Sequence, residues 1–214
     1  MGIRERRERE RAGTREKILD AARDLFVAEG YDGVTMRKVA EKIEYSPTAI
    51  YVHFANKEEL FRELCQADFD RLAHTFRAIA QIEDPGERLR RAGLAYVEFG
   101  VKYPNHYRLM FMTPHPHPVE PYEHQCEKKG NPEEDAYAFL KLVVTDALRA
   151  GLFRREMKDV ELIAQTLWAG MHGVVALEVS KQTDHWVEWR SLKKRAEFMI
   201  DALVYGLMQQ KKKE

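Results

Sequence analysis

Apolar residues recur at helical spacing along nearly the whole chain. Met36, Val39, Ala40 and Ile43, for example, follow the i, i+3, i+4, i+7 pattern that places side chains on one face of a helix. No convincing run alternates apolar and polar residues as a half-buried strand would. The pattern therefore predicts an all-α protein.

Helix start and stop signals divide the first part of the chain into three helices. Thr14 can cap a first helix, which we expect to stop at Gly30. Thr35 is placed to cap a short second helix. Ser46 followed by Pro47 is typical of the start of a third, because a proline in the first helical position loses no hydrogen bond.

Longer helices are expected beyond residue 56. Asp84 before Pro85 and Asp159 before an apolar run are both good caps. Residues 113 to 125 carry four prolines and are predicted to form a surface loop. The expected helices run from about 56 to 82, 84 to 103, 104 to 111, 131 to 151, from 159 onward, and 184 to 208.

The composition is that of a soluble globular protein. The 214 residues are 44% hydrophobic and 33% charged, which leaves enough apolar side chains for a core. Cys65 and Cys126 match neither a zinc spacing nor a disulfide framework, which favours a reducing compartment. The longest apolar stretch, 167 to 177, is short and contains His172, and no leader-like segment opens the chain. We therefore expect a cytoplasmic protein with no membrane partner.

The two short helices joined by Glu44 and Tyr45 have the layout of a helix-turn-helix, whose second helix enters a major groove. The start of a helix offers unpaired N–H groups to a phosphate, and Thr35 and Arg37 lie in that turn of the first short helix. These features predict a DNA contact at the start of the first short helix.

The second short helix is suited to reading bases. After the cap Ser46, the residues Pro47, Thr48 and Ala49 are small enough to let the backbone approach base edges. Polar groups that can reach phosphates follow it at Tyr51, His53 and Lys57.

These residues carry a resemblance to a known family. The segment GYDGVTMRKVAEKIEYSPTAIYVHFANKEELF, residues 30 to 61, resembles the N-terminal DNA-binding domain of the tetracycline-repressor (TetR) family. The resemblance implies phosphate contacts from Thr35, Tyr51, His53 and Lys57 and base readout from residues 47 to 49. Further along, residues 107 to 111 and 168 to 173 are similar to a TetR subgroup named for its Trp-His-Gly signature.

One position departs from the family pattern. Family members commonly have glycine in the turn between the two short helices, where the backbone φ is positive, and this chain has Glu44. A non-glycine residue in that conformation costs roughly 1 kcal/mol. We expect glycine at this position to stabilise the domain.

The resemblance implies three parts with different roles. Residues 1 to 13 alternate arginine and glutamate with nothing to bury, and are expected to be a flexible charged arm or a frayed extension of the first helix. Residues 14 to 56 form the DNA-binding domain, and residues 57 to 214 form a helical ligand-binding and dimerisation domain. We expect a homodimer on a palindromic operator, with a small organic effector that tilts the helix beginning at Lys57.

The ligand-binding surface is expected among aromatic residues of the second domain, because aromatic side chains with polar tips suit an organic ligand. Each of these side chains can equally be an ordinary core residue. The candidates are Tyr96, Phe99, Tyr103, Tyr107, Phe111, Tyr137, Trp168 and His172.

Apolar residues of the last two helices are expected to build a four-helix dimer interface. Gly170 and Gly173 are expected to allow close approach between helices. The interface candidates are Leu162, Ile163, Val174 and Leu177 on one helix and Leu192, Met199, Leu203 and Leu207 on the other.

The alternatives are of other classes. The sequence has no HExxH, GxSxG, CxxC or Glu-x-x-His motif, so we expect no enzyme and no cofactor. Thr35 and Ser46 can be helix caps alone, and His53 can be a neutral packing residue. The remaining alternative is a helical adaptor, or a small-molecule or metal-binding protein without a DNA-binding role. The hypothesis of a metal site depends on ligand-type residues of the 113 to 126 loop, and their spacing is irregular. These residues are His115, His117, Glu120, Glu123, His124 and Cys126.

The charge balance narrows how DNA could be bound. The chain has 35 Lys and Arg against 35 Asp and Glu, which argues against a polycation that coats nucleic acid or membranes. Residues 1 to 17 hold seven basic and four acidic side chains, and residues 33 to 57 hold four and two. DNA affinity must therefore come from a few placed contacts, from dimerisation and from the arginine-bearing arm, and should fall steeply with salt.

Overall fold

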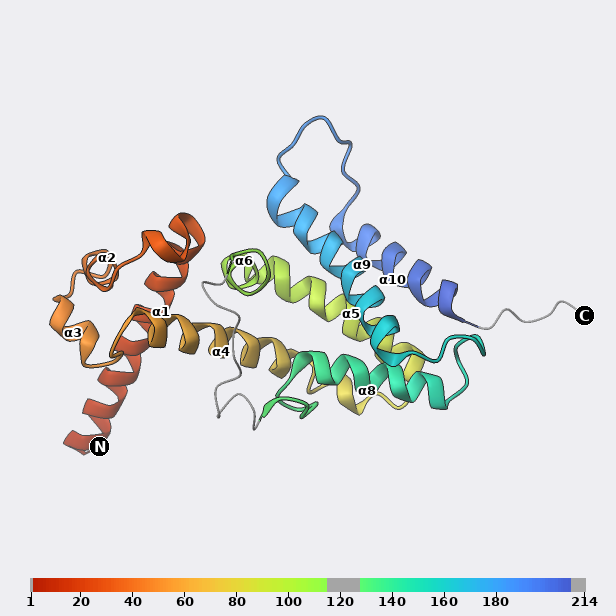
Figure 1. Ribbon diagram of the computed structural model, residues 1–214, viewed down its shortest axis with the longest axis horizontal. Helices are drawn as coiled ribbons and strands as arrows, with labels where there is room; N and C mark the ends of the chain where they lie inside the picture. The colour runs from red at the N-terminus through yellow and green to blue at the C-terminus, as the bar shows by residue number, and fades with distance from the viewer. Residues whose placement is uncertain (1, 115–127, 209–214) are drawn as a thin grey trace, which may run out of the picture. The chain divides into compact units, whose positions relative to one another are not determined.

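A computed structural model describes residues 2–114 and 128–208, and these residues form helices (Figure 1). The prediction of an all-α protein is confirmed: within the described ranges the only extended pairing is an isolated bridge between Phe153 and Met208. The elements are α1 (Ile3–Gly33), α2 (Met36–Lys42), α3 (Pro47–Tyr51), α4 (Lys57–Thr75), the 3-10 turn η1 (Ile79–Gln81), α5 (Pro85–Lys102), α6 (Pro104–Phe111), α8 (Ala136–Arg149), α9 (Val160–Lys181) and α10 (Leu192–Leu207).

The chain divides into two compact units. The first unit contains the described residues up to Asp68 together with the segment that begins at Asn105. The second unit contains Phe69 to Pro104 and the described residues from 128 onward. The packing boundary thus differs from the expected one at residue 57, because the first half of α4 and all but the first residue of α6 pack with the N-terminal helices.

The core of the first unit is formed by α1 to α4 and α6. Ile18, Phe26 and Leu60 are completely buried, and Leu109 of α6 belongs to the same cluster. The Phe26 ring meets the Phe61 ring edge to face at 4.9 Å, a favourable arrangement for two aromatic rings.

A buried ionic cluster ties three helices of the first unit together. Arg23 of α1 donates two hydrogen bonds to the carboxylate of Asp68 in α4, at 3.0 and 2.8 Å. The imidazole of His106 in α6 lies 2.7 Å from the same carboxylate. Asp68 is fully buried and Arg23 nearly so. Removing one partner of such a buried charge pair strongly destabilises the folded protein, because the other charge stays buried.

The first helix starts earlier than predicted. Residues 3 to 13, expected as a flexible arm or a frayed helical extension, form the first turns of α1. The side chains of residues 4 to 13 are exposed, and ion pairs at i, i+4 spacing between Arg4 and Glu8 and between Arg6 and Glu10 support the helix. The expected stop at Gly30 is confirmed as a break, since its φ of 71° and ψ of 175° are not helical.

Four predicted caps are in place, whereas the prediction that Thr14 caps the first helix is wrong. Thr14 lies inside α1 and its hydroxyl donates to the Glu10 carbonyl at 3.0 Å. The Thr35 hydroxyl accepts from the Lys38 N–H at 3.2 Å, and the Ser46 hydroxyl accepts from Ala49 at 3.3 Å. The carboxylates of Asp84 and Asp159 cap α5 and α9 in the same way. Each oxygen satisfies an N–H that the helix itself leaves unpaired.

Three other helix ends differ from the expected positions. The helix that starts at Lys57 ends at Thr75, and the short η1 turn follows it, whereas the pattern predicted one helix to residue 82. α8 begins after the cap Asp135, because residues 131 to 134 form a turn in which the Asn131 carbonyl accepts two N–H groups. α10 begins after the cap Ser191 rather than near 184.

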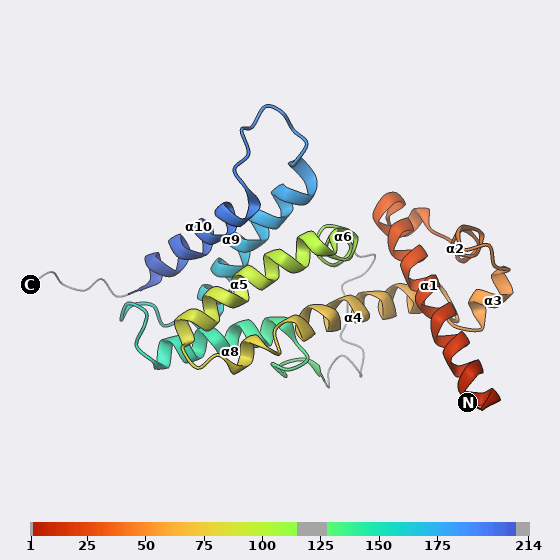
Figure 2. The ribbon, with the colours of Figure 1, turned by 180° about the vertical axis from the view of Figure 1, so that it is seen from behind.

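The second unit is a bundle in which α5, α8, α9 and α10 lie side by side (Figures 1 and 2). Glycines allow close contact at two crossings. A Cβ at Gly170 of α9 would lie 2.5 Å from Leu203 of α10, and one at Gly93 of α5 would lie 2.9 Å from Ile200. The expectation of close approach is right for Gly170 and wrong for Gly173, which faces open space.

Two residues expected in a dimer interface, Ile163 and Val174, are instead buried within their own chain. Met199 and Leu203 lie against Gly170 and are half-buried. Periodicity along a helix that is apolar on most sides cannot show which side meets which neighbour, and this is the reason for the error.

α9 is long and apolar enough to cross a membrane by length and composition. It is also the helix that contacts α5, α8 and α10, and a core helix of a bundle has the same composition. Glu161, His172 and Glu178 interrupt its apolar surface. Of the most apolar 18-residue stretch of α9, 33% is buried inside the bundle, and a single helix of this kind is weak evidence for a membrane span.

The predicted surface loop and the residues considered for a metal site lie largely outside the described residues. His115, His117, Glu120, Glu123, His124 and Cys126 fall in the segment 115–127. Elsewhere, in the two ranges given above, no group of three His, Cys, Asp or Glu side chains is placed to hold a metal ion.

Candidate nucleic-acid interface

Two short helices, α2 and α3, meet at a tight turn in the first unit. Glu44 in that turn has a φ of 58°, the positive value that the sequence predicted. The Tyr45 N–H closes the turn by donating to the Ala40 carbonyl at 2.9 Å. Ile50 of α3 is fully buried against the core, as are Val39 and Ala40 of α2. The buried side of α3 thus fixes which of its residues point outward.

The exposed side of α3 carries the residues predicted to read bases. Pro47 and Thr48 are exposed and Ala49 is half-buried, and none of these side chains extends far from the backbone. Tyr51, at the end of the helix, is about half exposed. A short helix with a small, exposed first turn and a polar aromatic at its end is suited to a DNA groove.

The basic side chains of α2 take part in intramolecular ion pairs. Arg37 pairs with Glu41 at 2.8 Å, one turn further along. Lys38 reaches both Glu29 and the Gly33 carbonyl, at 2.5 and 2.8 Å. Arg37 stays highly exposed, and an exposed pair of this kind is weak enough for a phosphate to compete with it.

Lys57, the first residue of α4, is held more firmly. Its ammonium donates to the Tyr31 carbonyl at 3.0 Å and lies 4.1 Å from the centre of the Tyr31 ring. Lys57 therefore stabilises the turn after Gly30 in addition to any contact with DNA. An ammonium has three N–H donors, so a phosphate can still bind to it.

His53 is the predicted phosphate contact with the most buried surroundings. Its Nδ1 atom is buried and has no hydrogen-bond partner in the described part of the chain. Burial lowers the pKa of His53, and the positive charges of Arg11 and Arg15 lower it further. The neutral form is thus favoured, which fits a packing residue better than a charged phosphate contact.

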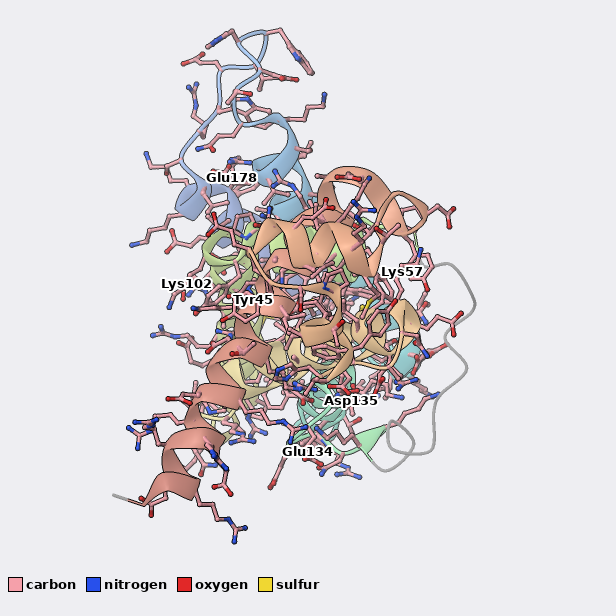
Figure 3. The ribbon with its side chains drawn as sticks, turned by 90° about the vertical axis from the view of Figure 1, so that its left-hand side faces the viewer. Tyr45, Lys57, Lys102, Glu134, Asp135 and Glu178 are labelled. Carbon is pink, nitrogen blue, oxygen red and sulfur yellow. The ribbon has the colours of Figure 1, made fainter. Side chains whose placement is uncertain are left out.

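Three residues near the short helices were not predicted from the sequence as part of the site. Tyr45 and Val52 flank α3 and are exposed, Val52 to 64%. The Arg15 guanidinium lies 4.9 Å from the centre of the Phe54 ring and pairs with Glu63. The position of Tyr45 after the turn residue could have indicated its exposure, whereas the contact of Arg15 depends on how α1 crosses α4. Tyr45 and Lys57 are labelled in Figure 3.

Four of the predicted ligand-binding residues come together in the second unit. The Trp168 indole N–H donates to the Tyr96 hydroxyl at 3.0 Å, and that hydroxyl lies 3.4 Å from Nδ1 of His172. The Tyr137 ring is 6.0 Å from that of Trp168, and its hydroxyl donates to Glu161 at 2.7 Å. Burial lowers the pKa of His172, which favours the neutral imidazole. The cluster offers aromatic faces and hydrogen-bonding tips to a neutral organic molecule.

The other four do not share one place. Phe99 is buried in the second unit with its ring 5.4 Å from that of Tyr103. Tyr103 carries the side chains of Arg71 and Lys102 over its ring, both at 5.2 Å. Tyr107 and Phe111 belong to the first unit, where Tyr107 is completely buried.

Family models match most of the chain. The model described as bacterial regulatory proteins, tetR family, matches residues 18–64. A model described as tetracyclin repressor-like, C-terminal domain, matches residues 89–203, which is more than half of the chain. The first match contains α2, α3 and their turn, and the second contains α5 and α8 to α10, apart from the ends of α5 and α10.

Curated relatives are similar mainly in the N-terminal part. The HTH-type transcriptional repressor AcnR of Corynebacterium efficiens is 42% identical over 62 residues, 29% of this chain and 33% of AcnR. The HTH-type transcriptional activator FasR of Mycolicibacterium smegmatis is 34% identical over 98 residues, 45% of each chain. The alignments thus span a third to a half of these relatives.

Solved structures are similar over nearly the full length. A TetR family transcription regulator from Marinobacter aquaeolei has a TM-score of 0.73 at 15% identity, covering 95% of this chain and 100% of that one. The ketosteroid transcriptional regulator KstR2 of Mycobacterium tuberculosis has a TM-score of 0.66 at 18% identity, covering 92% and 96%. At these identities the likeness concerns the fold.

Proposed function

Since this chain belongs to the tetR family of bacterial regulatory proteins, we propose that it is a sequence-specific DNA-binding transcriptional regulator. The observation that carries the proposal is the outward side of α3, where Pro47 and Thr48 are small and exposed, Ala49 is small and half-buried, and Tyr51 follows at the end of the helix. In this proposal residues 47 to 49 read base edges, and Thr35, Arg37, Tyr51, His53 and Lys57 contact or position phosphates.

The proposed active form is a homodimer. α10 exposes Phe198 to 79% and Tyr205 to 70%, and the spacing of seven residues places both on one helix face. Leu162 and Leu177 of α9 are also exposed. Exposed apolar residues of this size on two adjacent helices support an isologous four-helix contact. Two-fold symmetry then requires a roughly palindromic operator with half-sites about 34 to 36 Å apart, or a multiple of that.

The proposed effector is a small organic molecule bound in the second unit near Tyr96, Tyr137, Trp168 and His172. α4 would carry the signal, because Leu60 and Leu64 near its start are buried in the first core, while Phe76, just after its end, stacks on Phe139 at 5.0 Å. Moving a two-state equilibrium from 1:99 to 99:1 takes about 5.5 kcal/mol of differential effector affinity.

The proposed outcome of DNA binding is repression in the cytoplasm, relieved by the effector. AcnR is named a repressor and FasR an activator, so the direction of control needs its own test. A reporter gene placed behind the bound operator should be expressed more strongly when the regulator gene is deleted. Weaker expression on deletion would assign activation instead.

Binding of DNA is tested with the purified full-length protein and duplexes that flank its own gene. Fluorescence anisotropy should show saturable binding that is much tighter than binding to a random duplex of equal length. A protein that acts only as a helical adaptor would bind neither duplex. If no flanking duplex is bound, selection from a random-sequence DNA library decides whether any duplex is recognised.

Two substitutions separate the roles within the site. Thr48→Val should change the base preference at one operator position, with a discrimination loss of about 1 to 3 kcal/mol. Lys57→Ala should weaken binding to operator and random DNA alike and reduce the salt slope by about one per protomer. Equal effects of both variants on the two kinds of DNA would contradict the assignment of base and phosphate contacts.

A further inference from the structure

The first turns of α1 are a helix without a packing role of their own. Residues 4 to 13 are all exposed, and in Figures 1 and 2 these turns extend beyond α2, α3 and the start of α4. Side chains that end in nitrogen extend from them in Figure 3. A surface helix with no buried face is unusual, because most helical stability in proteins comes from packing.

One face of this extension is purely basic. On a helical wheel of about 100° per residue, the residues within about 40° of the buried Ile18 are Arg4, Arg7, Arg11 and Thr14. The glutamates of the extension lie on other sides of the helix. The stripe that faces the core further along α1 therefore continues outward as arginines.

This basic face runs beside the turn that follows α3. Arg15 lies over the Phe54 ring at 4.9 Å and pairs with Glu63. One turn earlier, Arg11 lies close enough to His53 for its charge to act on the imidazole. Arg11 is thus on the flank of the outward side of α3, and Arg7 lies about 6 Å further along the helix axis.

Arg7 and Arg11 also differ from their neighbours in pairing. Arg4 is paired with Glu8 and Arg6 with Glu10, at 2.9 and 3.3 Å. Among the described residues, no ion pair or hydrogen bond involves the side chain of Arg7 or Arg11. Two unpaired guanidinium groups are therefore available to an external anion.

From this arrangement we infer that the N-terminal extension of α1 is a second DNA-contacting surface, in which Arg7 and Arg11 bind phosphates of the strand that borders the groove occupied by α3. The inference rests on the proposed DNA-binding function and extends it beyond α2 to α4. The axial distance of about 6 Å between the two arginines is close to the rise of two nucleotides on one strand, about 6.8 Å. Guanidinium groups are well suited to phosphate, which they can bind through two N–H donors.

The test compares two double variants with the same change in charge. Arg7→Gln with Arg11→Gln removes the basic face, and Arg6→Gln with Arg9→Gln removes two arginines from other sides of the same helix. Glutamine and arginine have similar helix propensity, so neither variant should unwind the extension. Far-UV circular dichroism and the melting temperature check that both fold like the wild type.

The measurement is the affinity for operator DNA as a function of salt. Two contacts per protomer make four in a dimer, so the first variant should lower the slope of log K against log salt by about 3 to 4. It should weaken operator and random DNA in parallel, since phosphate contacts carry no sequence information. The control variant should change the slope by less than about one, because exposed charges beyond a Debye length of about 10 Å are screened.

Several results would overturn the inference. Equal slopes for the two double variants would mean that only overall charge matters, and an unchanged slope for the first would mean that Arg7 and Arg11 do not touch DNA. If the wild type binds operator DNA and the first variant binds it with the same salt slope, only this inference is refuted. A wild-type protein that binds no DNA refutes the proposed function as well.

Discussion

Replacing Glu44 by glycine is expected to stabilise the helix-turn-helix. Glu44 is the only non-glycine residue with positive φ among the described residues, at 58°. Its side chain is exposed, and its own N–H donates to the Glu41 carbonyl at 3.2 Å in a bond that glycine would keep. The substitution thus removes a backbone conflict without removing a described side-chain contact.

The size of the effect follows from two opposing contributions. The left-handed conformation costs an L-residue about 1 to 2 kcal/mol because Cβ approaches the carbonyl oxygen. Glycine avoids this cost but loses more conformational entropy on folding, about 0.5 to 1 kcal/mol. The net gain in the free energy of unfolding should be about 0.5 to 1 kcal/mol. For a chain of this length that corresponds to a rise in melting temperature of about 1 to 4 °C.

The assay is urea unfolding followed by far-UV circular dichroism, with calorimetry for the melting temperature. Glu44→Gln is the matched control, because it removes the same charge and keeps a Cβ in the strained position. The glutamine variant should stay within about 0.5 kcal/mol of the wild type. A glycine variant no more stable than the glutamine variant would refute the argument from backbone strain.

The same pair of variants separates strain from charge in DNA binding. Removing a carboxylate near the DNA face should raise the affinity of both variants for operator and random DNA alike. A gain seen only with glycine would instead mean that the turn geometry limits the placement of α3.

Three further predictions concern buried groups. Asp68→Asn should lower the free energy of unfolding by about 3 kcal/mol in urea titrations, because it removes the buried carboxylate that pairs with Arg23 and leaves only the more exposed Asp20 carboxylate beside that guanidinium. A loss below about 1 kcal/mol would show that the pair is solvated. Burial raises the pKa of Cys65 to about 12 from 9.0. In a Cys126→Ser background, the native protein should therefore react with iodoacetamide about a thousandfold more slowly than the unfolded protein. Similar rates would disprove the burial of the thiol. Burial also lowers the pKa of His172 below 6.5, so the unfolded chain binds the proton more readily than the folded chain. The free energy of unfolding should therefore fall as the pH drops below about 6.5. The melting temperature of His172→Asn should fall less steeply with pH, and a pH profile identical to that of the wild type would contradict this.

Local chemistry made much of the fold predictable. Thr35, Ser46 and Asp84 were recognised as caps because a cap depends on a hydroxyl or carboxylate within three residues of an unpaired N–H. The positive φ of Glu44 was predicted from the resemblance to the family, whose members commonly have glycine at this position of the turn.

The ends of two helices were predicted wrongly. Residues 131 to 134 contain a proline and two glutamates, as a first helical turn often does, yet Asp135 became the cap of α8. The helix from Lys57 was predicted to continue to 82, but it ends at Thr75 and the short η1 turn follows it. Helix periodicity shows that a segment is amphipathic and leaves its exact length to the neighbours it packs against.

The candidate site was predictable in the same uneven way. Residues 47 to 49 were placed on the outward side of a short helix, and the structure puts them there. The hydrogen bond from Lys57 to the Tyr31 carbonyl, 26 residues away, could not be predicted from the local sequence. Tyr107 was grouped with the ligand candidates by its residue type, and the structure shows that its side chain is completely buried.

The sequence by itself determined that the chain is helical, where most helices begin, and which family it resembles, because these depend on interactions within a few residues. Only the tertiary structure decided that Arg23, Asp68 and His106 meet in one buried cluster, and that Phe198 and Tyr205 remain exposed. Those outcomes depend on which helix faces meet. Such contacts join residues that are distant in sequence and are set by how the helices pack, so they cannot be predicted from a local sequence pattern.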